Sequence, residues 1–418
     1  MFDWENEIID QPVFQRLRHI RQLGLTSYVY HGAEHSRFGH SIGVMHLAGR
    51  FVEKLLRHPD HRELLMERQS WSESDFEPKV DQIVLEARLA GLLHDIGHSP
   101  FSHTGESILF PNDKRHEHYG EAILLSPELG IGGVIDNLLG QYGVTKERVA
   151  QLISYQSGEY EVGFVRELIS SVWDVDKMDY LLRDSLYCGV RYGLYDLERI
   201  VDTITLYDES PDGLLRLGIR GGGIHAIEGL ILARYFMFTQ VYFHAVRRAY
   251  DLILTDFIAE LIQSETGSDL YPEGVMEYIA WNDPRILAAM NQRMNKDDKN
   301  LAWKLASRQH PKRVYETDGH ADPAIIASAM FKLPKGLKEQ YPAVQIWTDQ
   351  AVDHPERFKM GAEVWPIRQS SGKWNSLANV SRALAGLVEI RQFRVYADVR
   401  DDDALENQIE RSCREIMA

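Results

Sequence analysis

The sequence predicts a mainly α-helical protein with a small β hairpin inserted in its core and a smaller α+β region at its C-terminus. From residue 11 to about residue 265, apolar residues recur every three or four positions between short breaks at Gly or Asp, which is typical of consecutive amphipathic helices. Asp-Gly and Gly-Gly-Gly lie among short β-like runs at 207–229, which suggests a small hairpin that leads into a helix from about residue 225. Residues 343–348 and 393–399 have the composition of strands, and a final helix is expected over about 404–417.

The length of 418 residues exceeds the usual range of a single domain. We therefore divide the chain into a helical domain at 1–265, a helical extension of this core at 266–330 and an α+β region at 331–418. The longest apolar runs, such as residues 89–93, are far shorter than the roughly 18 residues that a membrane helix needs, so no span is expected.

Composition and charge narrow the function classes. The chain holds 44% hydrophobic and 26% charged residues, which is typical of globular proteins. The acidic N-terminus has no apolar signal core and the only two cysteines, Cys188 and Cys413, lie far apart, so we expect a cytoplasmic location. A formal charge of -16 argues against a broad electrostatic hold on nucleic acid, although a local basic cleft is compatible with it. We expect an anionic substrate to be held by a metal and a few Arg or Lys side chains.

The helix predicted over 37–56 carries a histidine on its buried face. His40 shares that face with Val44, Leu47, Phe51 and Leu55, and an arginine lies one turn earlier. A lone buried histidine is more often a hydrogen-bonded core residue than a metal ligand, so His40 needs partners before it can be assigned a ligand role.

Residues 57–82 are rich in charge and poor in apolar pattern, and we expect them to form a surface insertion. The helix that follows, over about 82–94, ends in His94 and Asp95, whose nitrogen and oxygen can turn toward one cation. Ala87 and Gly91 precede His94 by seven and three residues, so small side chains let another helix approach this face. Capping is the alternative reason for a His-Asp pair at a helix end.

The motif SVWDVDKMDYLLRD at 171–184 offers further ligands. Its Asp176, Tyr180 and Asp184 fall at i, i+4 and i+8, with Lys177 on the same flank. A solvated helix face is the alternative, and spacing alone leaves open whether Asp174, Asp176 or Asp179 faces inward. Two histidines and two carboxylates would form a mixed nitrogen and oxygen set for a divalent cation with open positions for water and phosphate.

Five stretches resemble the deoxynucleoside triphosphate triphosphohydrolase branch of the HD superfamily, which includes the dGTPases and the SAM-and-HD-domain dNTP hydrolases. They are IIDQPVFQRLRHIRQLG, HGAEHSRFGHSIGV, LLHDIGHSPFSHTGE, DVDKMDYLLRDSLYCG and ARYFMFTQVYFHAVRRAYD. The resemblance is strong over 5–265, loose over 266–330 and faint beyond. It implies an HD-domain helical core, hydrolysis of a dNTP to deoxynucleoside and triphosphate, and assembly into dimers, tetramers or hexamers.

The resemblance also implies roles, position by position. It selects Asp176 over Asp174 and Asp179, so that the metal ligands become His40, His94, Asp95 and Asp176. The cofactor is then a divalent metal, which can be Mg, Mn, Fe, Ni, Co or Zn, with Mg or Mn favoured. His98 and His103 match catalytic histidines near the α-phosphate, and His116 matches a further one, with Glu117 as its acid partner.

The implied substrate contacts divide into two groups. Those that hold the triphosphate are Arg37, Lys177, Arg234 and Tyr242. Gln22 and Leu23 match the pair that lies against the deoxyribose and leaves no space for a 2′-hydroxyl, and Tyr180 and Asp184 complete the sugar pocket. Arg247 and Arg248 remain unassigned between solvent and a second nucleotide.

An activating nucleotide bound between subunits is a further partner that the resemblance implies. Asp10, Gln15 and Arg18 match positions used for it in some relatives. Relatives usually carry a Lys/Arg-Asp-Pro-Val/Ile-His-Gly stretch just upstream, and the printed sequence begins after that point, so we expect either a truncated chain or an altered regulation.

Two other functions stay open at this point. The same site could cleave another phosphoester, such as a nucleoside monophosphate, a cyclic dinucleotide or an oligonucleotide end. It could also serve as a nucleotide-binding sensor with weak turnover, against which the retention of His98, His103 and His116 argues, because a decayed site need not keep them.

Overall fold

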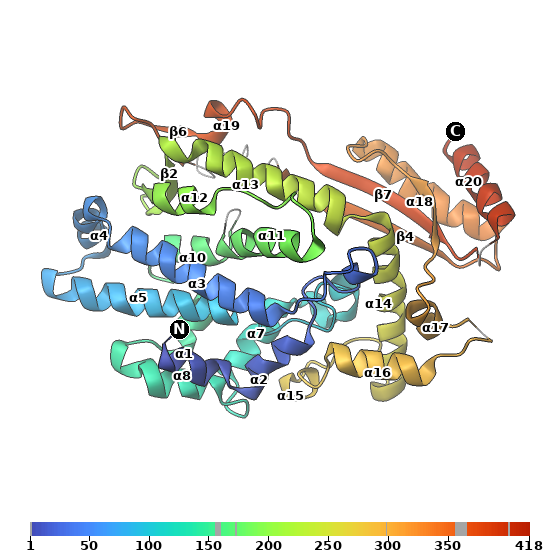
Figure 1. Cartoon of the computed structure of the whole chain (residues 1–418), viewed down its shortest axis with the longest axis horizontal. Coiled ribbons are helices and arrows are strands. Elements are labelled where there is room, and N and C mark those ends of the chain that lie inside the picture. The colour runs from blue at the N-terminus through green and yellow to red at the C-terminus, as the bar shows by residue number, and fades with distance from the viewer. Residues whose placement is uncertain (1, 155–159, 172–173, 298, 356–365, 400–401) are drawn as a thin grey trace.

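Two long helices, α3 (Arg37–Leu56) and α5 (Glu73–Leu93), lie side by side at the centre of the helical core (Figure 1). The computed structural model describes residues 2–154, 160–171, 174–297, 299–355, 366–399 and 402–418. A Cβ on Gly91 would stand 2.9 Å from the carbonyl oxygen of Val44, so the absence of a side chain there permits the close approach of the two helices, as the sequence predicted.

Further helices surround this pair, and the mainly α fold class is confirmed. The N-terminal ones are α1 (Asp3–Ile9), α2 (Pro12–Gln15), α4 (Arg62–Gln69), α6 (Glu106–Leu109), α7 (His116–Leu125), α8 (Ile131–Leu139), α9 (Lys146–Ile153) and α10 (Gly163–Ile169). Those that follow are α11 (Val175–Cys188), α12 (Leu197–Thr203), α13 (Ile224–Met237), α14 (Ala245–Thr266), α15 (Val275–Tyr278), α16 (Asp283–Arg293) and α17 (Leu301–Ala306). Among the described residues, no helix combines the length and the apolar character that a membrane crossing requires.

The predicted end of the surface insertion at residue 82 is wrong, because α5 already begins at Glu73, and the part before it contains the helix α4. Ser72 caps α5 by accepting a hydrogen bond from Asp75 N over 3.2 Å, and the Asp75 carboxylate accepts one from Ser72 N in return. Phe76, Val80 and Ile83 supply a fully buried face at helical spacing. The charged residues between them lie on the exposed face. Because they separate the apolar positions, the helical pattern of this segment was not recognised in the sequence.

The predicted hairpin is confirmed as β1 (Ile204–Tyr207) and β2 (Arg216–Arg220), which pair antiparallel. The sheet extends in the order β1-β2-β5-β6 with β5 (Pro366–Arg368) and β6 (Trp374–Ser376), which the sequence did not predict, and the short helix α19 (Leu377–Val380) follows them. Ile367 is fully buried in the main core. A segment far along the chain thus completes a sheet that begins in the helical core.

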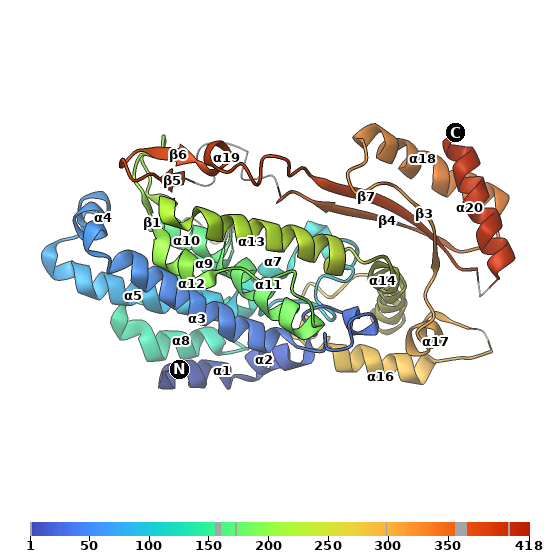
Figure 2. The same cartoon turned by 45° about the horizontal axis from the view of Figure 1, so that its top comes forward.

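A second sheet of order β3-β7-β4 lies near the C-terminus, and its strands are antiparallel. Its elements are β3 (Lys312–Glu316), β4 (Ile346–Asp353) and β7 (Ile390–Ala397), with α18 (Pro323–Gln340) and α20 (Asp403–Met417) beside them. The two predicted strands and the final helix are therefore present, while β3 lies in a part that was predicted to be helical. Figure 2 shows β4 and β7 running above α13 toward α14, with α18 and α20 at the far end. The domain limits at 265 and 330 remain predictions.

Candidate active site

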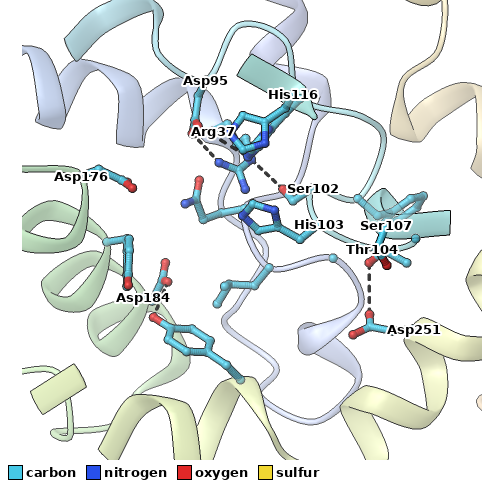
Figure 3. A pocket seen from close by; sticks show the side chains of 18 of the residues that line it. Arg37, Asp95, Ser102, His103, Thr104, Ser107, His116, Asp176, Asp184 and Asp251 are labelled. Atoms are coloured by element: carbon cyan, nitrogen blue, oxygen red, sulfur yellow. Dashed lines mark hydrogen bonds and ion pairs between the residues drawn. The ribbon is translucent and has the colours of Figure 1, made fainter. Parts of the chain in front are cut away.

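A cavity of about 840 Å³ lies where four segments distant in sequence meet. Its walls come from residues 22–24, the loop after α5, the first half of α11 and the start of α14. Figure 3 shows Asp95, His116 and Arg37 on one side of this cavity and Asp176 and Asp184 on another. The segments of the chain that carry the predicted catalytic and substrate-binding residues therefore converge on one space.

Two histidines and two carboxylates meet at one end of this cavity. His40 Nε2 lies 2.9 Å from Asp176 Oδ1 and 3.5 Å from Asp95 Oδ2. His94 Nε2 lies 3.3 Å from Asp95 Oδ1 and 3.7 Å from Asp176 Oδ1. The four predicted metal ligands, from α3, the end of α5 and α11, thus lie together, and His40, His94 and Asp176 offer ligand atoms within 4.8 Å of one another.

The orientation of both imidazoles is fixed by hydrogen bonds from Nδ1, the ring nitrogen that faces away from Asp95 and Asp176. His40 Nδ1 donates a hydrogen bond to Asp179 Oδ2 over 2.8 Å, and His94 Nδ1 donates one to the Gly91 carbonyl oxygen over 2.9 Å. The Nε2 atom of each ring is buried and has no hydrogen-bond partner among the described residues. In its neutral form each ring would turn the Nε2 lone pair toward carboxylate oxygens, an arrangement that a cation between them would stabilise.

The electrostatics of this end of the cavity also favour a positive charge. Burial opposes ionisation of His40, but Asp176 and Asp179 raise its pKa to about 10. His40, His94 and Asp176 thus offer two unpartnered nitrogens and one carboxylate oxygen within 4.8 Å of one another, a group that could hold a divalent metal, with Asp95 beside both histidines.

Arg37 links the Asp95 carboxylate to the loop after α5. It forms an ion pair with Asp95 and donates a hydrogen bond from Nε to Ser102 Oγ over 2.7 Å. Burial works against the charge on Asp95, but Arg37 keeps its pKa well below the ordinary value. Phe101 and Ser102 have left-handed φ angles of 57° and 62°, which non-glycine residues seldom adopt, and Phe101 N is held by Asp283 Oδ1 at 2.7 Å.

Three histidines form the wall beside this loop. The ring centroids of His98 and His116 are 3.7 Å apart, and those of His98 and His103 are 4.8 Å apart. Glu106 accepts hydrogen bonds from Nδ1 of His103 over 2.6 Å and from Nδ1 of His116 over 2.7 Å. The predicted acid partner, Glu117, is 3.6 Å from His116 Nδ1. Burial and the nearby Arg37 lower the pKa of His98 well below its ordinary value, which favours the neutral ring.

The predicted sugar contacts form a connected group. Asp184 accepts hydrogen bonds from Tyr242 Oη and from His35 Nε2, each over 2.8 Å. The backbone of Gln22 donates to the His35 carbonyl oxygen over 2.9 Å, which fixes Gln22 and Leu23 at the cavity wall. The Gln22 Oε1 atom is buried without a hydrogen-bond partner in the described part of the chain.

The acids of α11 have three different environments. Asp174 caps the helix by accepting from Lys177 N over 2.9 Å, and its carboxylate also accepts from Lys177 Nζ over 2.7 Å. Asp179 is bonded to His40 Nδ1, whereas Asp176 lies on the Nε2 side. Of the three candidates that spacing left open, Asp176 is the one that shares its environment with both histidines.

Some predicted residues lie outside the cavity wall. Arg234 is paired with Asp353 of β4, while its neighbours Tyr180 and Phe238 line the cavity. The three residues predicted for a regulatory nucleotide are Asp10, which follows α1, Gln15 in α2 and Arg18 in the turn after it. Gln15 Oε1 accepts a hydrogen bond from Arg18 Nε over 2.7 Å. None of the three residues lines the cavity.

Comparison with known families agrees with this geometry. The HD domain matches residues 37–184, which carry all four predicted metal ligands. The HD associated region matches residues 195–413, more than half of the chain. The chain belongs to the HD-domain family.

Relatives of this HD-domain protein include proteins with a named activity. It is 36% identical over 252 residues to the uncharacterized protein YwfO of Bacillus subtilis, which covers 60% of this chain and 51% of YwfO. It is 31% identical over 288 residues to the deoxynucleoside triphosphate triphosphohydrolase SAMHD1 homolog of Dictyostelium discoideum, covering 67% of this chain and 51% of that protein. The chain thus spans about half the length of these relatives.

A solved structure shares the fold of this HD-domain protein along almost its whole length. A hypothetical protein from Aquifex aeolicus superposes with a TM-score of 0.73, covering 99% of this chain and 96% of that one, at 24% identity. The architecture of the C-terminal region is therefore shared as well as that of the HD domain.

Several residues of this HD-domain site escaped the sequence reasoning. Glu106 was not predicted, although it ends the motif LLHDIGHSPFSHTGE and follows His103 by three residues. This spacing brings two side chains together in a turn. Asp179 was considered as a ligand and not as the support of one. Asp353 had no local signal, because it lies 119 residues from Arg234 in the sequence. Arg247 and Arg248, which were left unassigned, both line the cavity.

Proposed function

We propose that this HD-domain hydrolase converts deoxynucleoside triphosphates to deoxynucleoside and inorganic triphosphate with a divalent metal, for which Mg or Mn is favoured. The convergence of two unpartnered histidine nitrogens and two carboxylates at one end of a large cavity carries this proposal. The relatives named as dNTP triphosphohydrolases support the substrate class. A homo-oligomer and an activating nucleotide belong to the same proposal as predictions from the resemblance, and a cytoplasmic location belongs to it as a prediction from the N-terminal sequence and the two distant cysteines.

His40, His94, Asp95 and Asp176 would hold the metal, which when bound supplies Lewis-acid chemistry toward phosphoryl oxygen and water. The site residues prepare for it before any ligand arrives. Asp179 and Gly91 hold the imidazoles in place, and Arg37 keeps Asp95 in its ionised form.

The reaction needs a proton at the leaving oxygen. Water oxygen forms a bond to the α-phosphorus while the bond from phosphorus to the 5′-oxygen breaks, and the 5′-oxygen leaves with a proton. An ionised carboxylate only accepts hydrogen bonds, so Glu106 fixes the hydrogen of His103 and of His116 on Nδ1. Nε2 is then the atom of each ring that can hold or give a proton in the cavity.

The binding contacts in this proposal divide between the phosphates and the sugar. Lys177 lies beside Asp176 along α11, where a triphosphate would reach it, and Tyr242 is a further triphosphate contact at the cavity wall. Leu23 and Gln22 would pack against the deoxyribose, and Tyr180 and Asp184 would complete the sugar pocket. Discrimination against ribonucleotides would then come from close packing, because a 2′-hydroxyl would need space that Leu23 occupies.

The test is to incubate the purified full chain with Mg²⁺ or Mn²⁺ and the four dNTPs, singly and in pairs, and to identify the products by chromatography. Deoxynucleoside and triphosphate in equal amounts are expected. Asp176→Ala should abolish the activity, whereas Asp202→Ala, a matched change of an exposed acid on α12, should preserve it. Folded, metal-loaded protein that releases neither product from any dNTP would disprove the proposal, and nucleoside monophosphates and cyclic dinucleotides would then be tested with the same variants.

A further inference from the structure

Strand β4 carries two carboxylates on its buried face. Burial alternates along the strand, so that Trp347, Asp349, Ala351 and Asp353 are covered while the residues between them are not. Carboxylates are almost never fully buried unless they are paired. Two acids, four residues apart, therefore project from the C-terminal sheet toward the helical core.

Each of these acids holds an arginine of the helices beside the cavity. Asp353 is paired with Arg234 of α13, and Asp349 accepts hydrogen bonds from Arg248 Nε of α14 at 3.0 and 3.1 Å. The side chains of Asp353 and Asp349 are only 6% and 2% exposed. These two buried ion pairs join β4 to α13 and α14.

Arg234 is separated from the cavity by aromatic side chains. Its guanidinium lies 4.6 Å from the ring centroid of Phe238, and the Phe238 ring meets that of Tyr242 at 5.0 Å. Phe238, Tyr242 and Tyr180 all line the cavity. Arg234 already contacts Tyr180 through a side-chain hydrogen bond. A change of the Arg234 side-chain torsions past Phe238 would carry its positive charge from there to the cavity surface.

The pair between Arg234 and Asp353 leaves bonding capacity unused. Arg234 Nε and Asp353 Oδ2 are both buried and have no hydrogen-bond partner among the residues that the structure describes. A buried donor or acceptor without a partner destabilises the arrangement that leaves it so. An anion with several oxygens, such as a polyphosphate, could satisfy the guanidinium more completely than this carboxylate does.

We propose that Asp353 competes with the polyphosphate of the substrate for Arg234, and that the terminal phosphates of a bound substrate displace it. This inference rests on the proposed function, because it assigns Arg234 to the polyphosphate. Displacement would break one of the two ion pairs that join β4 to the helices beside the cavity. Substrate binding is then coupled to the contact between the C-terminal sheet and the helical core.

The test measures the affinity of the full chain for tripolyphosphate by isothermal titration calorimetry. Asp353→Asn keeps the shape of the side chain and removes its charge, so the Kd is expected to fall by three- to tenfold. Glu198→Gln is the matched control, because it removes one carboxylate from Arg50 on an exposed surface, and its Kd should equal that of the wild type. Asp353→Ser, which also lacks the charge, should give the same direction of change if Asp353→Asn does not fold.

A double-mutant cycle separates competition for Arg234 from a general loss of negative charge. In an Arg234→Gln background, Asp353→Asn should leave the Kd for tripolyphosphate unchanged. No tightening in the single Asp353 variants, or equal tightening in the Arg234→Gln background, would overturn the inference. Tripolyphosphate binding is measured separately from hydrolysis. If the Kd values change as expected but no dNTP is hydrolysed, only the proposed function is rejected. If dNTPs are hydrolysed but the Kd values do not change as expected, only the role of Asp353 is rejected.

Discussion

His40 donates its Nδ1 hydrogen to Asp179 Oδ2 over 2.8 Å and thereby directs its Nε2 atom at Asp176, 2.9 Å away. Asp179 is itself held by Arg183, which donates from Nε over 2.6 Å and from Nη2 over 2.9 Å. The tautomer and the ring orientation of this buried, predicted metal ligand are therefore set by a charged pair on α11. Such supports commonly raise the basicity of a metal-binding imidazole.

The support by Asp179 predicts a metal-binding defect at a residue that does not face the metal. Asp179→Ala should weaken the binding of Mn²⁺ by about 10- to 100-fold, because the His40 ring loses the acceptor that fixes its tautomer. Calorimetric titration of metal-free protein measures this change. Asp202→Ala on the surface of α12 should bind Mn²⁺ like the wild type, and an equal affinity of both variants would refute the role of Asp179.

Gly43 predicts a second route to the same defect. A Cβ at this position of α3 would stand 1.9 Å from Asp179 Oδ1 and 2.4 Å from Arg183 Nη2, so Gly43→Ala should displace the pair and reduce Mn²⁺ affinity and turnover together. Gly133→Ala in α8 is the control, since no atom lies within 4 Å of its Cβ. That change should stabilise the protein by about 0.5–1 kcal/mol, measured by urea unfolding, and leave metal binding intact. Normal Mn²⁺ affinity in Gly43→Ala would show that the pair tolerates displacement.

The sequence predicted much of the helical core because its signals are local. Apolar spacing located α3, and the small residues before His94 anticipated its contact with α5. The start of α5 was missed because charged residues separate Phe76 and Val80, although Ser72 and Asp75 formed a readable capping box. Strands β5 and β6 could not be predicted, because each is only three residues long and β5, with which β6 pairs, depends on pairing with β2 across a long sequence separation.

The candidate site divides along the same line. Spacing suggested a metal near His94 and Asp95, but the choice among the acids of α11 came from resemblance, and only the geometry shows why Asp174 is occupied as a helix cap. Arg234 illustrates the opposite case. Its partner Asp353 comes from another sheet, and no local pattern announces a contact between residues 119 positions apart.

The two aspartates of the predicted ligand set should differ in their effects on stability. Asp95→Ala leaves Arg37, whose side chain is 4% exposed, without its partner, and removing one member of a buried pair costs about 3–5 kcal/mol. Asp176 is 31% exposed, so its replacement by Ala should destabilise the protein less than that of Asp95 does. Chemical denaturation in the presence of a chelator measures both values without a contribution from bound metal. Both variants should be inactive with Mn²⁺ restored, and equal stability losses would contradict the burial argument.

Glu106 predicts the pH dependence of the activity. Burial favours the neutral form of His116, but Glu106 raises the pKa of His116 above its ordinary value. Burial also favours the neutral form of Glu106, but His116 and His103 lower the pKa of the Glu106 carboxyl. If the protonated His116 ring serves the reaction, activity falls as the pH rises through its pKa. Glu106→Gln removes the charge that raises this pKa, so the alkaline limb of the kcat/KM profile should move to lower pH. Glu117→Gln should move it less in the same direction, because Glu117 lies at 3.6 Å from Nδ1 and Glu106 at 2.7 Å. A larger shift in Glu117→Gln would make Glu117 the principal acid partner, as the sequence alone had suggested.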